Sequence, residues 1–132
     1  MSRRVIVPFA MIFVLLGSNT ADAYTPTTAE RSAHADTNYV RVHFGRRTVV
    51  LNDVLSPCAH QHSAAMAAHR TLYHSRCSRF RENVGYGPTL DAIARAYIHS
   101  PVHRANLLCG CYHEAVGVVR SGSLYWMTNI YW

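Results

Sequence analysis

Histidine, cysteine and a few acidic residues are the side chains in this sequence that could do chemistry. Its 132 residues include nine histidines, four cysteines and seven Asp and Glu. Histidine can exchange protons near neutral pH and can bind zinc. His60 and His62 are two residues apart and point to different faces of a helix, and His74 and Glu82, eight apart, lack the His-Glu-x-x-His spacing. Any site built from these residues must therefore be assembled by the fold.

Serine nucleophiles have weaker support. Ser63 does not lie in a Gly-x-Ser-x-Gly turn, and Ser100 is followed by Pro101, which is typical of a helix end. Ser100, His103 and Glu82 together would imitate a hydrolytic triad. Three-residue helical spacing disfavours the required geometry between histidine and serine, so we do not expect such a triad.

The N-terminus predicts export. Met1-Ser2-Arg3-Arg4 precedes an apolar run over 5–16, and an Ala-x-Ala exit ends at Ala23. This order is typical of a secretory signal peptide over residues 1–23. The alternative is a retained membrane anchor, but the apolar run is too short to span a bilayer. We expect a secreted or envelope-associated protein with no transmembrane segment after cleavage.

The charge is basic, with 13 Lys and Arg, all of them Arg, and a formal net charge of +6. An exported chain should not meet nucleic acid, so we expect no nucleic-acid partner. The positive field would instead attract anionic envelope polymers or lipid headgroups, unless the charge serves only solubility.

The four cysteines, Cys58, Cys77, Cys109 and Cys111, indicate a disulfide framework in a small exported chain. A Cys109–Cys111 bridge would close a very tight ring. We therefore expect each of these two cysteines to pair with one of Cys58 and Cys77. A zinc site is the weaker alternative, because Cys-x-Cys is not the usual finger spacing and an oxidised thiol cannot bind metal.

Local patterns predict the helices that must position any site. Residues 24–36 are polar and lack apolar periodicity, so we expect a flexible lead-in, followed by a helix over 37–44. Apolar residues recur at helical spacing over about 53–73, and a third helix over 89–100 begins at the N-cap Thr89. A short helical turn follows over 102–108.

The C-terminal third predicts a β-hairpin. Residues 114–120 are rich in Val, 121–123 form a turn, and 124–132 carry bulky residues on both faces. A strand buried on both faces needs cover on both sides. The simplest α/β architecture is therefore a three-layer α-β-α sandwich, with a small, mainly antiparallel sheet between helices.

A set of short motifs resembles the bacterial branch of the CAP superfamily, the SCP-like domain of cysteine-rich secretory, antigen-5 and pathogenesis-related proteins. The resemblance covers residues 37–132 and implies that one CAP/SCP-like domain occupies this range, with the family's α-β-α fold. It rests on Asn38-x-x-Arg41, His62-Ser63-x-x-Met66, His74, Glu82-Asn83-Val84-Gly85, Ser100-Pro101-x-His103-Arg104-x-Asn106 and Val116-Gly117-Val118.

The resemblance also implies a surface cleft. The family gathers two histidines and two acidic residues there, and the matching positions are His74, Glu82 and His103. Ser100 stands where relatives outside bacteria have the second acid. His99, His113 and Glu114 flank the proposed cleft and could substitute for that acid.

Two imidazoles and a carboxylate that converge could hold zinc or another divalent cation with an open position for water. The alternative is that His74, Glu82 and His103 hydrogen-bond one another and the backbone, and so only join the helices to the sheet. Arg81 stands beside Glu82 and could form an ion pair with it.

Aromatic residues point to a different class of function. Tyr125, Trp126, Tyr131 and Trp132 lie on the last predicted strand, and exposed members would form a platform for an apolar ligand. The CAP family includes lipid- and sterol-binding members. We expect a monomeric extracellular binding module for a lipid, sterol or cell-wall ligand, in preference to an enzyme. The alternative is a metal-dependent, peptidase-like hydrolase using His74, Glu82 and His103.

Overall fold

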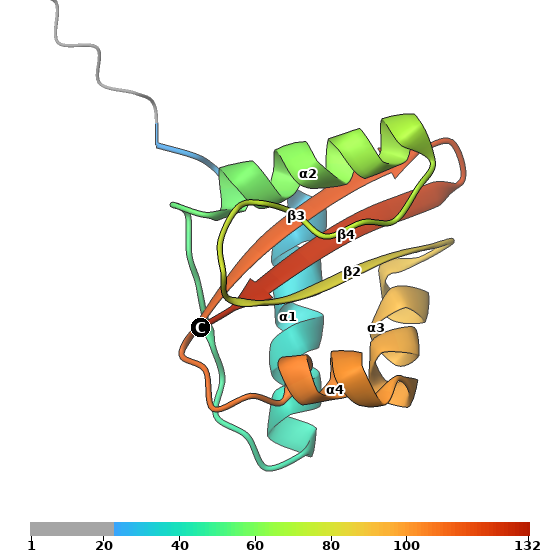
Figure 1. The fold of residues 1–132 in the computed structure, drawn as a ribbon. Coiled ribbons are helices and arrows are strands. Elements are labelled where there is room, and N and C mark those ends of the chain that lie inside the picture. The colour runs from blue at the N-terminus through green and yellow to red at the C-terminus, as the bar shows by residue number, and fades with distance from the viewer. Residues whose placement is uncertain (1–22) are drawn as a thin grey trace, which may run out of the picture.

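The computed structural model describes residues 23–132, and the predicted signal peptide, apart from Ala23, lies outside them. The chain forms a four-stranded sheet covered by helices on both faces (Figure 1). The helices are α1 (Thr28–His43), α2 (Ser56–His69), α3 (Leu90–His99) and α4 (Pro101–Leu107). The strands are β1 (Val50–Leu51), β2 (Arg81–Gly87), β3 (His113–Ser121) and β4 (Leu124–Tyr131). The expected three-layer α-β-α architecture is confirmed.

The sheet has the order β1-β3-β4-β2. The hairpin of β3 and β4 forms its antiparallel centre, β2 adds antiparallel to β4, and the short β1 adds parallel to β3. The mainly antiparallel sheet is therefore confirmed. Because β2 is at the edge of the sheet, side chains from the helices on both faces can reach its residues.

Helix α2 covers one face of the sheet. It approaches so closely that a Cβ added at Gly117 of β3 would lie 2.0 Å from the backbone carbonyl carbon of Ala59. Ser63 of α2 also donates a 2.9 Å hydrogen bond to the Gly117 carbonyl. Gly117 is therefore the contact point at which this helix rests on the central hairpin.

Helices α1, α3 and α4 cover the other face, where the largest apolar core lies. Its fully buried members include Ile93 of α3, Leu107 of α4 and Val116 of β3. The predicted helix 89–100 is confirmed, and the Thr89 side chain caps it by accepting a hydrogen bond from the Ala92 amide. The helical turn predicted over 102–108 is α4, and the β-hairpin lies where it was predicted.

The flexible lead-in predicted over 24–36 is wrong from Thr28 onward, because helix α1 already begins there. Thr27 and Glu30 form a capping box at its start. The buried face of α1 contains Glu30, Thr37 and Arg41, which are buried through hydrogen bonds. Hydrophobic periodicity cannot detect a buried face made of polar side chains.

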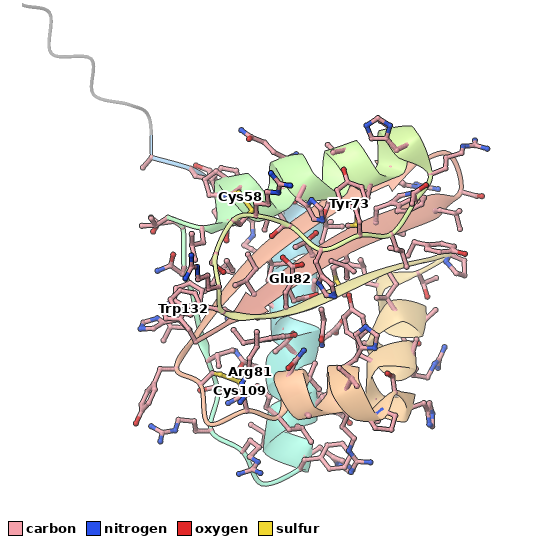
Figure 2. The ribbon with its side chains drawn as sticks, in the orientation of Figure 1. Cys58, Tyr73, Arg81, Glu82, Cys109 and Trp132 are labelled. Atoms are coloured by element: carbon pink, nitrogen blue, oxygen red, sulfur yellow. A yellow bond between two sulfur atoms is a disulfide. The ribbon has the colours of Figure 1, made fainter. Side chains whose placement is uncertain are left out.

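The expected disulfide pairing is also wrong. The bridges join Cys58 to Cys77, with Cα atoms 5.8 Å apart, and Cys109 to Cys111, with Cα atoms 5.2 Å apart. Cys58 lies in the first turn of α2, and the segment between α2 and β2 returns past this turn and brings Cys77 to it (Figure 2). Cys109 and Cys111 are left to close the short ring between α4 and β3.

Candidate functional site

The candidate cleft lies at the β2 edge of the sheet. His74 belongs to the segment between α2 and β2, Glu82 is the second residue of β2, and His103 lies in α4. Glu82 sits between the strand and the segment that crosses above it (Figure 2). The three residues matched to the family cleft therefore come from three separate elements, as their sequence spacing requires.

Glu82 is held by the segment that crosses it. Its Oε1 accepts a hydrogen bond of 2.8 Å from the Ser75 amide and lies 2.7 Å from His74 Nδ1, while the Ser75 hydroxyl donates to Oε2. Only 10% of the Glu82 side chain is exposed, against 70% for His74. Both carboxylate oxygens of Glu82 are thus occupied by protein groups, and His74 is the exposed member of the pair.

His103 approaches from the other side of β2. Asn83 follows Glu82 on the strand, so the two side chains point to opposite faces, and Asn83 donates to the His103 carbonyl at 2.9 Å. The His103 ring stacks on Tyr97 at a centroid distance of 5.2 Å. Burial lowers the pKa of His103, and the nearby His74 lowers it further. His103 is therefore close enough to His74 to respond to its charge, but it is packed into the other layer.

Ser100 and His103 do come together, contrary to expectation. The Ser100 hydroxyl lies 2.7 Å from His103 Nδ1. Helical spacing does not apply to this pair, since Ser100 is the N-cap residue of α4 with an extended backbone (φ −96°, ψ 118°). Glu82 is bonded to His74 and Ser75, so no Ser-His-Glu chain forms.

The site does not fit a preformed metal centre. Among residues 23–132, no three His, Cys, Asp or Glu side chains are grouped so that they could hold a metal ion. His74 Nδ1 already pairs with one oxygen of Glu82, and the Ser75 hydroxyl pairs with the other. His103 lies on the other face of β2. His74 and Glu82 follow the alternative in which these groups hydrogen-bond one another, whereas the His103 ring bonds Ser100 instead.

The other residues considered for the cleft lie elsewhere. Glu114 does not replace the missing acid, because it is fully buried in β3 and lies 2.6 Å from His34 Nδ1. Arg81 forms no ion pair with Glu82 in the described part of the chain, since neighbouring strand residues point to opposite faces.

The predicted aromatic platform is mostly core. Trp126 and Tyr131 of β4 are buried, whereas Tyr86 of β2, which stacks on Trp126 at 4.9 Å between ring centroids, is 53% exposed. The end of β4 places Trp132 against Phe80, with the two rings stacked 5.1 Å apart. The outer ring of each pair keeps exposed surface, since Tyr86 is 53% and Phe80 50% exposed.

Two hollows adjoin the cleft. A small one of about 220 Å³ is lined by His74, Ser75, Ser78, Phe80 and Glu82. A larger open groove of about 670 Å³ lies between the start of β2, the end of α3, and α4 with the loop after it. Sequence reasoning missed this groove, and it also missed Ser75, because neither Ser75 nor the groove's Arg46 belongs to a recognisable motif.

Comparison with known proteins identifies the fold. No protein-family model and no curated protein matches the sequence. An outer surface protein from Borrelia burgdorferi superposes with a TM-score of 0.70 at 14% identity, over 81% of this chain and 94% of that one. Venom allergen-like protein 4 from Schistosoma mansoni gives 0.64 at 12% identity, over 80% and 88%.

A third solved structure carries the domain name. An extracellular protein containing an SCP domain from Bacillus anthracis gives a TM-score of 0.59 at 18% identity, over 81% of this chain and 45% of that one. At such low identities the likeness shows the fold alone. This chain therefore has the α-β-α fold of the CAP superfamily, the fold of the SCP domain.

Proposed function

We propose that this protein is an extracellular or envelope-associated binding module for a lipid, sterol or cell-wall ligand, and that it is not an enzyme. The observation that carries the proposal is the state of Glu82, the carboxylate of the cleft. Both of its oxygens accept hydrogen bonds from Ser75 and His74. A general base must also be open to its substrate, and Glu82 is held by three hydrogen bonds with only 10% of its side chain exposed.

The sequence and the similar solved structures support the proposed extracellular or envelope location. The N-terminus has the order of a secretory signal peptide. Two of the similar structures are, by name, an outer surface protein and an extracellular protein. The four helices described over 23–132 are all too short or too polar to cross a bilayer.

The second candidate is a metal-dependent, peptidase-like hydrolase that uses His74, Glu82 and His103. One observation favours it: His74 is 70% exposed and its Nδ1 lies 2.7 Å from a carboxylate, an arrangement that can orient a histidine for proton transfer. The missing three-donor grouping within residues 23–132 disfavours a metal-dependent route.

The two candidates make opposite predictions for one titration. Zinc is titrated calorimetrically into the oxidised protein and into a His74→Ala/His103→Ala variant whose fold is checked by circular dichroism. The binding-module proposal predicts no saturable one-to-one zinc site that depends on these histidines. It also predicts that hydrolysis of a peptide panel stays at background, with or without a chelator. A one-to-one site lost in the variant, together with peptide hydrolysis lost on chelation, would establish the hydrolase instead.

Ligand binding is the positive arm of the same test. The protein is assayed against a fluorescent fatty acid, a sterol and insoluble peptidoglycan. The proposal predicts saturable binding of at least one of these ligands, unchanged by chelator and by His74→Ala. Failure to bind any of them would contradict the proposal.

A further inference from the structure

The groove beside the cleft combines cationic and apolar side chains. Arg46, Arg81 and Arg104 line it from three separate elements: the turn after α1, the start of β2, and α4. Ile98 and Leu108 give it an apolar lining between these cations. We call this surface the arginine groove. Arg81 lies beside the Cys109 end of the groove (Figure 2).

The cations of the arginine groove are uncompensated. Within residues 23–132, the ion pairs involve three histidines and Arg95, and none involves Arg46, Arg81 or Arg104. The Arg104 guanidinium carbon lies 4.6 Å from the centre of the Phe44 ring, which orients the group and leaves its N–H edges available. Three guanidinium groups without an acidic partner around one hollow form a site for an anion.

A buried arginine, Arg41, holds the loop that lines the arginine groove. Arg41 has no solvent exposure, and its guanidinium donates to the carbonyls of Arg47, Leu107, Cys109 and Cys111 at 2.7 to 3.3 Å. Arg41 therefore fixes the loop that forms one wall of the groove.

Exposed apolar side chains lie on two of the segments that carry these cations. Val102 of α4 is 71% exposed, and Phe44, which follows α1, is 37% exposed. The end of α1 and helix α4 lie at the same end of the molecule, at the bottom of Figure 1. Cations together with exposed apolar side chains characterise surfaces that lie on anionic bilayers, whereas a fully hydrophilic polyanion would leave the apolar side chains without a partner.

We propose that the arginine groove binds the phosphate of an anionic phospholipid headgroup at a bilayer surface, with Phe44 and Val102 entering the headgroup layer. This inference rests on the proposed function, because it names the ligand of a binding module. It places ligand recognition at α4 and the turn after α1, and it requires no chemistry at His74 or Glu82.

The test is flotation with vesicles of phosphatidylcholine alone and of phosphatidylcholine mixed with phosphatidylglycerol. The protein used is residues 24–132, the chain expected after signal cleavage, which contain every helix, strand, disulfide and core cluster of the described fold. The groove variant is Arg46→Gln/Arg81→Gln/Arg104→Gln. The matched control, Arg31→Gln/Arg70→Gln/Arg120→Gln, removes the same charge from exposed positions away from the groove.

We expect binding to the phosphatidylglycerol vesicles that falls by about fivefold for each groove arginine removed, roughly a hundredfold for the triple variant. The control should lose less than about tenfold, and Phe44→Ser/Val102→Ser should weaken binding although no charge changes. Arg46→Glu is a single change at an exposed loop position, and it keeps the test valid if the triple variant is poorly folded.

Three outcomes would overturn the inference: equal losses in both triple variants, equal binding to the two vesicle types, or unchanged vesicle binding by Phe44→Ser/Val102→Ser. The first would assign binding to diffuse charge, and the last to an anion site that does not use the bilayer. Each would leave the wider proposal standing if the fatty acid, sterol or peptidoglycan assay still shows saturable binding.

Discussion

Glu114 Oε2 lies 2.6 Å from His34 Nδ1, so a carboxylate without solvent exposure joins the central strand β3 to helix α1. The other oxygen, Oε1, accepts hydrogen bonds of 2.8 Å from Thr37 and from Asn129. Glu114 therefore connects three elements, and it is a structural residue of the interior, not a member of the cleft.

We expect Glu114→Ala to lower the free energy of unfolding by about 3 to 5 kcal/mol, because it leaves His34, Thr37 and Asn129 without their shared partner inside the protein. Urea denaturation followed by tryptophan fluorescence measures this loss. Asp53→Ala, at an exposed acid, is the control and should change stability by less than about 0.5 kcal/mol. Similar losses in the two variants would show that Glu114 makes no specific contribution.

Gly117→Ala should be among the most damaging single substitutions in this fold. The new methyl group would meet the Ala59 carbonyl carbon at 2.0 Å, and this neighbour is helix backbone that cannot rotate away. We expect a loss of about 4 kcal/mol or more, seen as a lower urea midpoint or as failure to fold. Gly110→Ala is the matched control, since a Cβ there would have nothing within 4 Å. A folded Gly117→Ala protein with an unchanged midpoint would contradict the packing of α2 on β3.

Glu30 should make stability depend on pH. Burial acts to raise the pKa of Glu30, but hydrogen bonds from Tyr24, Thr27, His60 and Val118 outweigh it, and the net pKa lies below the ordinary value of 4.5. A depressed pKa stabilises the fold above about pH 4.5, and this contribution is lost as the pH falls through the lower, folded-state value.

Glu30→Gln removes this pH-dependent contribution. The difference in unfolding free energy between the native protein and the variant should be largest above pH 4.5 and should shrink on acidification. Urea titrations at a series of pH values give this difference. A gap that stays constant with pH would show that the pKa of Glu30 is the same in the folded and unfolded chains.

His103 should report the charge of His74. Burial and, to a smaller extent, His74 lower the pKa of His103. In His74→Gln, we expect the pKa of His103 to rise while staying below its ordinary value of 6.5, because the burial remains. A pH titration of the histidine ring protons by NMR measures this. His69→Gln, at an exposed position at the end of α2, should leave the pKa of His103 unchanged.

The two disulfides should differ in importance. The bridge between Cys58 and Cys77 spans 19 residues, whereas Cys109 and Cys111 are separated by only two positions. In the chain-entropy model, losing the longer loop costs about 3 kcal/mol and losing the shorter one costs less. Thermal unfolding of Cys58→Ser/Cys77→Ser and Cys109→Ser/Cys111→Ser compares them. Non-reducing peptide mapping checks the pairing itself, and any fragment that joins Cys77 to Cys109 would refute it.

The features that could be predicted from the sequence are those with local signals. Helices α3 and α4 and the hairpin of β3 and β4 lie where apolar spacing, Thr89, Pro101 and the Ser-Gly-Ser turn predict them. Strand β2 was not predicted as a strand, because Arg-Glu-Asn-Val-Gly-Tyr-Gly has no apolar alternation and becomes a strand only by pairing with β4. The first part of α1, before Thr37, was missed because its buried positions are the acidic Glu30 and the small Ala33.

For the candidate site, the family resemblance predicts a cleft shared by His74, Glu82 and His103. In the structure these residues come from the segment before β2, from β2 and from α4. The face of β2 on which each of these side chains lies depends on strand register. It also depends on the segment between α2 and β2, which brings the Ser75 amide to Glu82. The arginine groove depends on the same long-range arrangement, since Arg46, Arg81 and Arg104 come together only when three distant segments meet.

The sheet order β1-β3-β4-β2 places the two latest strands in the sequence at the centre. The polar groups of α1 depend on that hairpin, because Glu30 accepts from the Val118 amide 88 residues away and His34 pairs with Glu114 80 residues away. An N-terminal fragment lacks both of these partners, so we expect native structure to form only after residue 131 has left the ribosome. Folding would then be a single late event in the synthesis of the chain.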